Sequence, residues 1–292
     1  MILVVGATGQ LGGMITRRLL ALGLPVRILV RPTSAYTPLV AAGAHPVFGD
    51  LKDQHSLNVA CEGVEQVLTT ANSALRGGAD TVQTVDLDGN RRLIDAAAKA
   101  GVQQFVFTSA LGADVHSPDA FMQGKARSEA HLRASGLPHT ILAPNIYMEV
   151  WAAAVVGRPA LAGQPVTLVG EGRRKHTMIA MGDVMEYATR LLSHYTGTHP
   201  YLPLGGPEAL SWRDIVATFE RILGRHIPVQ YVRPGDPVPG LPPTMVGLLA
   251  AMEQFDSPVD MHDLAQAFHI TPTPLEAVVR RDYAPALAGT LA

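Results

Sequence analysis

The sequence contains little cysteine, few charged residues and few aromatic residues, and these shortages exclude several classes of protein. Only one of the 292 residues, Cys61, is a cysteine, so a framework of intramolecular disulfides is excluded. Charged residues make up 16% of the chain and aromatic residues 5%, while hydrophobic residues make up 47%. Such a chain can bury a large core, because disordered chains are poor in apolar residues and rich in charge.

An excess of charge of either sign is also lacking, since the formal net charge is −2. No basic stripe is present that would indicate binding to nucleic-acid phosphates. No stretch approaches the roughly 20 consecutive apolar residues that a transmembrane helix needs. The first strand candidate begins at Ile2, which leaves no room for a signal peptide ahead of it. We therefore expect a cytoplasmic protein that binds neither nucleic acid nor membranes.

Short apolar runs alternate with helical patterns through the first half of the chain. The strand candidates are 2–5, 26–30, 47–48, 64–68, 105–107 and 140–142, and the helix candidates are 10–22, 35–43, 53–61, 80–100 and 119–135. Strands that are apolar on both faces and alternate with helices predict a parallel sheet covered by helices on both sides. Gly101 and Gly136 follow two of the helix candidates, where a left-handed residue commonly ends a helix.

The alternation loosens in the second half, where most of the 22 prolines lie. Residues 234–243 include five prolines, which indicates a loop. Ser211 and Asp214 have the spacing of a capping box, which predicts a helix that ends near Gly224. Two further helices are expected at 260–269 and 274–282.

These patterns predict the domain organisation. We expect an α/β protein in which residues 1–144 form a Rossmann-type, doubly wound parallel sheet that binds NAD(P). Residues 145–292 are expected to form a smaller α/β lobe that binds the substrate, with a boundary that is not sharp.

A glycine-rich segment joins the first strand candidate to the first helix candidate. It reads Val4-Val5-Gly6-Ala7-Thr8-Gly9-Gln10-Leu11-Gly12-Gly13. Glycines at this spacing allow a tight turn, close approach of a pyrophosphate to the backbone, and close packing of helix on strand. The helix N-terminus adds free N–H groups and the positive end of its dipole. A turn that merely needs glycine is the alternative, but the strand–helix context favours a dinucleotide site. The predicted cofactor-binding residues in this loop are Gly6, Thr8, Gly9, Gln10, Leu11 and Gly12.

The end of the second strand candidate indicates which dinucleotide is bound. An NAD-specific site places an acid there to accept hydrogen bonds from the ribose hydroxyls. This chain has Arg31 followed by Thr33 and Ser34, which can donate to a 2′-phosphate. We therefore predict NADP(H) as cofactor, with NAD(H) as the alternative. Asp50 and Leu51 are predicted to meet the adenine edge, although Asp50 could equally be a helix cap.

Five segments of the sequence resemble one family. They are Gly6–Gly12, Phe105-Val106-Phe107-Thr108-Ser109-Ala110, Gly124-Lys125, Ala143-Pro144-Asn145-Ile146-Tyr147-Met148-Glu149 and Gly205-Gly206-Pro207-Glu208-Ala209-Leu210-Ser211. Together they resemble the NmrA-like group of atypical short-chain dehydrogenases/reductases along nearly the whole chain. The resemblance implies an NAD(P)H-binding protein. Members include reductases of quinones, dyes and phenolic compounds, and also redox sensors that bind NADP.

The resemblance also implies a catalytic region, from which this chain departs at one position. Short-chain dehydrogenases use Tyr-x-x-x-Lys, whereas the matching residues here are Phe121 and Lys125. Phenylalanine cannot pass a proton, so Lys125 is left to anchor the nicotinamide ribose, unless it is an exposed helix lysine. Tyr147 is predicted as the second catalytic residue. The remaining predicted cofactor-binding residues are Thr70, Ala71, Ser109, Pro144 and Asn145, with Lys125 also contacting the cofactor.

Three functions compete on this evidence. The favoured one is an NAD(P)H-dependent oxidoreductase that reduces a small apolar carbonyl or quinone-like substrate by hydride transfer, because the cofactor itself carries that chemistry. An NADP(H)-sensing regulator without turnover is the alternative, and an epimerase is weaker because the Tyr-x-x-x-Lys pair is broken.

The eleven histidines show no ligand spacing, so no metal site is expected. Cys61 is predicted to be a small buried apolar residue rather than a nucleophile. A homodimer and a protein partner both stay open.

Overall fold

The computed structural model describes residues 1–74, 76–193 and 199–288, and these form two compact units. Unit 1 comprises Met1–Pro144 and Met185–Pro203, and unit 2 comprises Asn145–Val184 and Leu204–Ala292. The domain boundary predicted from the sequence was a single one, after residue 144. In the structure, residues 185–203 return to unit 1.

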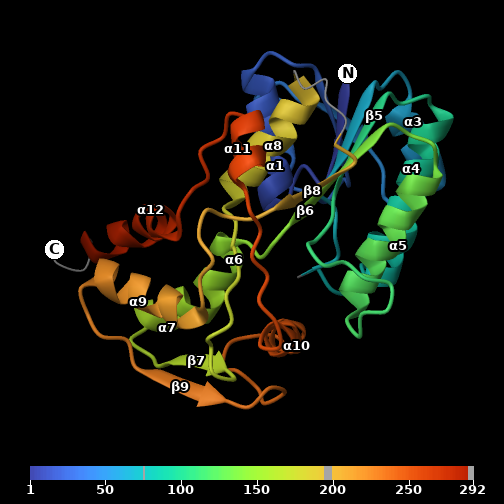
Figure 1. Ribbon diagram of the computed structural model, residues 1–292. Helices are drawn as coiled ribbons and strands as arrows, with labels where there is room; N and C mark the ends of the chain where they lie inside the picture. The colour runs from blue at the N-terminus through green and yellow to red at the C-terminus, as the bar shows by residue number, and fades with distance from the viewer. Residues whose placement is uncertain (75, 194–198, 289–292) are drawn as a thin grey trace. The chain divides into compact units, whose positions relative to one another are not determined.

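Unit 1 contains a sheet between two layers of helices (Figure 1). Its elements are β1 (Ile2–Val5), α1 (Gln10–Ala21), β2 (Val26–Val30), α2 (Thr37–Ala41), β3 (His45–Phe48), α3 (Gln54–Cys61), β4 (Gln66–Thr69), the π-helical η1 (Val82–Leu87), α4 (Asp88–Lys99), β5 (Gln104–Thr108), α5 (Ala120–Ala134) and β6 (His139–Pro144). Helix α8 (Met181–Ser193) and strand β8 (Tyr201–Leu204) follow later in the chain. Every element predicted for the first half is therefore confirmed, with shifted ends.

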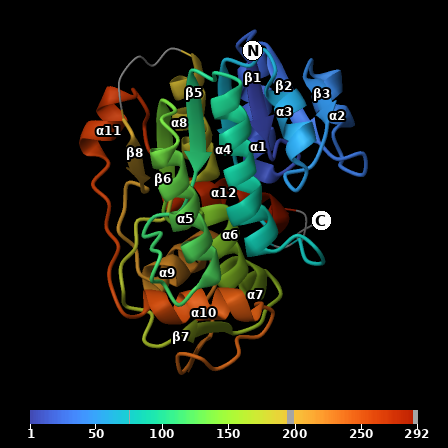
Figure 2. The same ribbon diagram turned by 90° about the vertical axis from the view of Figure 1, so that its right-hand side faces the viewer.

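The sheet has the strand order β3-β2-β1-β4-β5-β6-β8. Each of the five pairings from β3 to β6 is parallel. Helices α3, α4 and α5 lie over one face, where α4 and α5 stand in front of the strands in Figure 2, and α1 and α8 lie over the other. This is the predicted doubly wound arrangement. The order reverses between β1 and β4, and ligands bind at such a switch point, outside the carboxyl ends of the strands.

The strands are buried because both faces of the sheet are covered. All four residues of β1 are buried, as are most of β5 and β6. Cys61, at the end of α3, is fully buried in this core, and burial raises the pKa of its thiol to about 11. The thiol therefore stays protonated at neutral pH, and the prediction of a packing role is confirmed.

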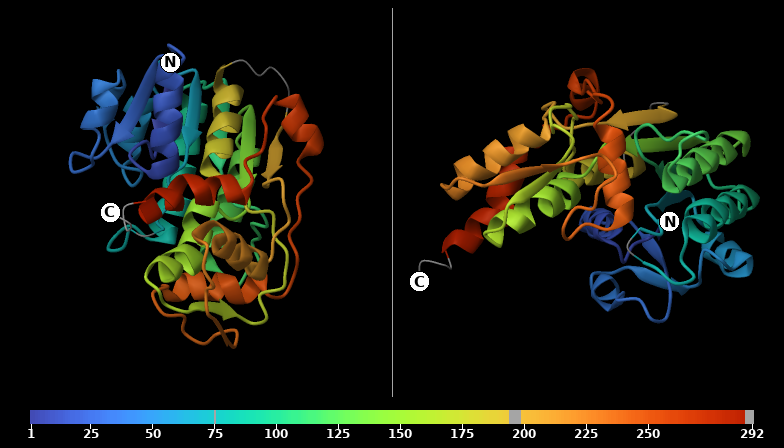
Figure 3. Two further views of the ribbon diagram at one scale, coloured as in Figure 1. Left: turned by 90° about the vertical axis from the view of Figure 1, so that its left-hand side faces the viewer. Right: turned by 90° about the horizontal axis from the view of Figure 1, so that it is seen from below.

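Helix α8 returns to unit 1 because it packs beside α1 (Figures 1 and 3). Glu186 of α8 pairs with Arg18 of α1, with Nε and Oε1 3.2 Å apart. Neither this helix nor its return to unit 1 was predicted, because the pairing of α8 with α1 joins residues that are far apart along the chain.

Unit 2 is built from shorter elements around its own core. They are α6 (Met148–Ala152), the π-helical η2 (Ala153–Gly157), α7 (Arg158–Leu161), β7 (Val166–Val169), α9 (Trp212–Leu223), β9 (Val229–Val232), α10 (Pro243–Met252), α11 (His262–Ala267) and α12 (Leu275–Ala288). Strands β7 and β9 pair in parallel. The predicted helices correspond to α9, α11 and α12, and the predicted loop at 234–243 ends where Pro243 begins α10.

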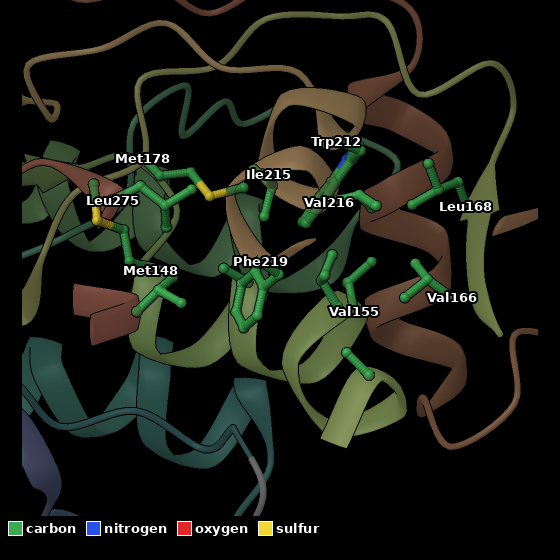
Figure 4. Packing of buried hydrophobic residues seen from close by; sticks show 14 of the residues in the cluster. Met148, Val155, Val166, Leu168, Met178, Trp212, Ile215, Val216, Phe219 and Leu275 are labelled. Carbon is green, nitrogen blue, oxygen red and sulfur yellow. The ribbon is translucent and has the colours of Figure 1, made fainter. Parts of the chain in front are cut away.

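The core of unit 2 forms around α9. In Figure 4 the side chains of Trp212, Ile215 and Phe219 of α9 lie in one cluster, with Met178 on one side and Val155, Val166 and Leu168 on the other. The predicted capping box is confirmed, because Ser211 and Asp214 each accept a hydrogen bond from the other residue's backbone N–H. None of the helices within the described residues is long and apolar enough to cross a lipid bilayer.

Candidate functional site

The glycine-rich loop connects β1 to α1 at the switch point of the sheet. Gly6 has a φ of +88°, and a Cβ there would lie 2.7 Å from Thr70 Oγ1 and 2.9 Å from the Ala71 nitrogen. A Cβ on Gly12 would lie only 2.3 Å from the Gly6 carbonyl oxygen. These two glycines therefore let α1 approach β1 and β4 closely. Thr70 and Ala71 are the residues beside Gly6 at the end of β4.

Gly9 has a different environment from Gly6 and Gly12. It is the N-cap of α1, its φ of −78° is open to any residue, and a Cβ there would contact only the Gly6 carbonyl oxygen, at 3.2 Å. Among the described residues no side chain caps α1, and its first turn holds no acidic residue. The helix thus presents its positive end and backbone N–H groups for an anion.

Gly9→Val is expected to abolish dinucleotide binding while the protein stays folded. The β-branched side chain fits beside α1 but would stand in front of the N–H groups that a pyrophosphate needs. Calorimetric titration with NADPH and NADH measures the loss, and thermal unfolding checks the fold. Unchanged affinity for both cofactors would exclude this loop as the phosphate site.

A pocket in unit 1 adjoins the glycine-rich loop. Its lining residues are Val5, Gly6, Thr8, Leu29, Arg31, Ser34, Gly49, Asp50, Leu51, Ala71, Arg76, Asp80 and Val85. Six of the predicted cofactor-binding residues are thus brought together, although they come from four separate segments. Of the other predicted loop residues, Gln10 is exposed and Leu11 is buried at the start of α1.

Asp50 is not the cap of a helix. Helix α3 is capped by Asp53, whose carboxylate accepts from the backbone N–H groups of His55 and Ser56. Asp50 instead accepts a hydrogen bond from the Lys52 backbone nitrogen at 2.9 Å. The helix-cap alternative is therefore wrong, and Asp50 is one of the residues that line the pocket.

Asp80, which no sequence pattern marks, lies at the centre of a group of charged side chains at this pocket. Its Oδ2 is 2.8 Å from Arg31 Nη1 and 3.5 Å from Arg76 Nη1, and its Oδ1 accepts a hydrogen bond from Lys52 Nζ. The hydrogen bond from Lys52, together with that from Arg31, lowers the pKa of Asp80 to about 2. Asp80 is thus ionised throughout the physiological range.

Lys125 lies in a second polar cluster of unit 1. It is 2% exposed, and its Nζ donates to the Thr108 carbonyl oxygen at 3.0 Å. Asp86 Oδ1 lies 3.8 Å from Nζ, and the rings of Phe107 and Phe121 lie within 5.4 Å. Burial lowers the pKa of Lys125, against the opposing effect of Asp86. The exposed-lysine alternative is therefore wrong, because Lys125 lies on the face of α5 that packs against the sheet.

Ser109 follows β5 and belongs to the same cluster. Its hydroxyl donates to Glu129 Oε1 at 2.5 Å, and Glu129 also pairs with Arg133 at 2.9 Å. Sequence reasoning missed Glu129, although it stands one helical turn after Lys125 and therefore on the same face of α5. The neighbouring hydroxyl of Thr108 is buried and has no hydrogen-bond partner among the described residues.

Of the residues predicted around the end of β6, Pro144 belongs to unit 1, whereas Asn145 and Tyr147 lie at the start of unit 2. Pro144 ends β6, and its carbonyl oxygen accepts from the Leu111 nitrogen. The Asn145 amide donates to the carbonyl and hydroxyl oxygens of Ser257, both at 3.1 Å. This amide therefore holds a distant loop of its own unit.

Tyr147 precedes α6 and retains a free hydroxyl. The hydroxyl is buried without a hydrogen-bond partner among the described residues. Burial, together with the nearby Glu149 carboxylate, raises the pKa of Tyr147 well above its usual value. The phenol therefore remains protonated and able to donate. Lys125 and Tyr147 belong to different units, so their joint catalytic role stays a prediction.

A comparison with family models identifies the chain. The model of the NmrA-like family matches residues 1–280. This chain belongs to the NmrA-like family.

Among the residues that the structure describes, no three His, Cys, Asp or Glu side chains are grouped as metal ligands would be.

Three proteins that are similar to this chain have different named functions. An NAD(P)H azoreductase from Xenophilus azovorans is 31% identical over 80% of this chain and 76% of its own. The photosystem II assembly factor Ycf39 of Cyanophora paradoxa is 32% identical over 79% of this chain and 71% of its own. The structure of an NADPH-dependent quinone oxidoreductase from Escherichia coli superimposes with a TM-score of 0.80, at 25% identity, over 96% of this chain and 99% of its own.

Proposed function

We propose that this NmrA-like protein is an NADP(H)-dependent oxidoreductase that reduces a small apolar carbonyl or quinone-like molecule by hydride transfer. The observation that carries the proposal is the uncapped N-terminus of α1 at the sheet's switch point, beside a pocket lined by Arg31. The names of the azoreductase and quinone oxidoreductase relatives support the same reaction class.

The residues present fit a dinucleotide with a 2′-phosphate. A Cβ at Gly6 or Gly12 would fill the turn, whereas Gly9 leaves the end of α1 open for a pyrophosphate. Asp50 and Leu51 would border the adenine. Arg31 would pair with the 2′-phosphate, because a guanidinium forms two parallel hydrogen bonds to phosphate oxygens.

Arg31→Ala is expected to weaken NADPH binding by about 1.5–3 kcal/mol, the range for a hydrogen bond to a charged group. NADH has no 2′-phosphate, so its affinity should change little. Calorimetric titration with both cofactors makes the comparison. Arg91→Ala, which removes an exposed arginine of α4, is the matched control. Equal losses for NADPH and NADH would place the 2′-phosphate elsewhere.

The bound cofactor would supply the hydride, and the chain would orient it and stabilise the product oxyanion. Lys125 would hold the nicotinamide ribose and add positive charge. The candidate donors are the Asn145 amide and the hydroxyls of Ser109, Thr108 and Tyr147. The Asn145 amide and the Ser109 hydroxyl already donate to Ser257 and Glu129. The Thr108 and Tyr147 hydroxyls have no partner within the described residues, and we assign the oxyanion hydrogen bond to Tyr147 because a phenol is a stronger acid than an aliphatic hydroxyl.

One observation favours a second function, an NADP(H)-binding regulatory or assembly protein without turnover. Phe121 stands where the short-chain dehydrogenases have their acid, and its ring lies against the Lys125 ammonium. Ycf39, an assembly factor, is also among the relatives.

Oxidation of NADPH in the presence of quinones, enones, azo dyes and aldehydes separates the two functions. Turnover with any of these acceptors supports the reductase. Tight NADPH binding without turnover on the whole panel would contradict it and favour the regulatory protein.

A further inference from the structure

Asp80 joins three cations that come from three separate segments of unit 1. Arg31 follows β2, Lys52 follows β3, and Arg76 lies in the segment after β4 that also carries Asp80. The Asp80 side chain is only 10% exposed, whereas those of the three cations are 32–40% exposed. The carboxylate therefore sits inside the cluster, with the cations around it.

Three of the four members of this cluster line the candidate cofactor pocket. Arg31, Arg76 and Asp80 all line it, together with Ser34 and Asp50. Asp80 thereby ties the segment after β4 to the ends of β2 and β3. The ion pairs hold together the walls of the pocket that would receive an adenosine.

A carboxylate and a phosphate monoester compete for the same partners. Both accept charge-assisted hydrogen bonds from guanidinium and ammonium groups. The Arg31 Nη1–H that donates to Asp80 at 2.8 Å cannot donate to a phosphate oxygen in the same direction. The two anions would also repel each other at the short distances that one cluster imposes.

We propose that Asp80 is an internal competitor for the 2′-phosphate of NADP(H), occupying the cations Arg31, Lys52 and Arg76 until the cofactor displaces it. The proposal rests on the proposed function, in that it takes this pocket as the adenosine site. Asp80 then sets cofactor specificity by weakening the binding of nucleotides that carry a 2′-phosphate and leaving the binding of those without it unaffected.

The charge balance gives the direction of the effect. Three cations face two carboxylates, those of Asp80 and of Asp50, whose Oδ2 is 3.7 Å from Lys52 Nζ. Replacing Asp80 by asparagine keeps the shape of the side chain and removes one negative charge. The cations are then free to bind an incoming dianion.

The test is calorimetric titration of the full-length protein with 2′,5′-ADP and with 5′-AMP. These probes carry the adenosine end with and without the 2′-phosphate and need no nicotinamide. For Asp80→Asn we expect 2′,5′-ADP to bind about tenfold more tightly, as expected when a repulsive unit charge is removed from a partly solvated site, while 5′-AMP binds as before. Asp80→Ser should likewise tighten the binding of 2′,5′-ADP and leave the binding of 5′-AMP unchanged.

Glu65→Gln is the matched control. It removes the same charge from an exposed residue just before β4, at the edge of the sheet opposite the carboxyl ends of the strands. Its affinities should equal those of the wild type.

The remaining outcomes are distinct. Wild-type protein that binds neither nucleotide overturns the proposed cofactor site and this inference together. Wild-type protein that binds both, with unchanged or weaker binding of 2′,5′-ADP in the Asp80 variants, overturns this inference alone, since Asp80 would then only organise the cations.

Discussion

Gly12→Ala is expected to destabilise the protein by about 3 kcal/mol, at the upper end of the range for overpacking. The added Cβ would lie 2.3 Å from the Gly6 carbonyl oxygen and 2.7 Å from Thr70 Oγ1. The first of these atoms belongs to the backbone and cannot rotate away, so α1 must move off the sheet. Because the same movement displaces the N–H groups at the start of α1, NADPH affinity should fall as well.

Urea denaturation and calorimetric titration measure the two effects of Gly12→Ala. Gly182→Ala is the matched control, since this glycine also lies in a helix but a Cβ there has no neighbour within 4 Å. The control should be unchanged or more stable by about 0.5–1 kcal/mol, the usual difference between alanine and glycine in a helix. If Gly12→Ala is as stable as the wild type, α1 does not pack as closely as the structure shows.

Lys125→Met is expected to slow NADPH oxidation by about 10–100-fold, a loss of about 1.4–2.7 kcal/mol of transition-state stabilisation. The methionine keeps the length of the side chain and its apolar stem but lacks the charge that would face the developing oxyanion. Cofactor binding should weaken too, since Lys125 is assigned to the nicotinamide ribose. Measuring kcat and the cofactor Kd separately distinguishes the two roles.

The burial of Lys125 adds an effect on stability. Without the ammonium, the buried Asp86 carboxylate loses its cation, and breaking a buried ion pair in this way costs about 3 kcal/mol or more. The double variant Asp86→Asn/Lys125→Met removes both charges and should recover most of that stability while turnover stays slow. If turnover returns with stability, Lys125 supports the fold only.

The sequence by itself determined those structural features of this protein that depend on residues close together along the chain. Apolar runs such as Ile2–Val5, alternating with helical patterns, predicted the parallel sheet, because burial on both faces leaves this pattern in each strand. The conformation of the glycine-rich loop could also be predicted, because the spacing of Gly6, Gly9 and Gly12 is the one that the turn and the close packing of α1 require. The capping box at Ser211 was predicted for the same reason, since all its hydrogen bonds lie within four residues.

Only the tertiary structure decided which charges meet. Asp80 reaches Arg31 across 49 positions of sequence, and no local pattern marks that pairing. For Lys125 the sequence left an exposed helix lysine open as the alternative to a cofactor anchor, and only the packing of α5 on the sheet buries it beside Asp86, 39 positions earlier. The strands β7, β8 and β9 were missed because the second half of the sequence lacks the regular alternation of apolar runs and helical patterns, and their pairing comes from distant residues. Long-range packing places these groups, because the energy of an ion pair or a strand pairing depends on distance in space and not along the chain.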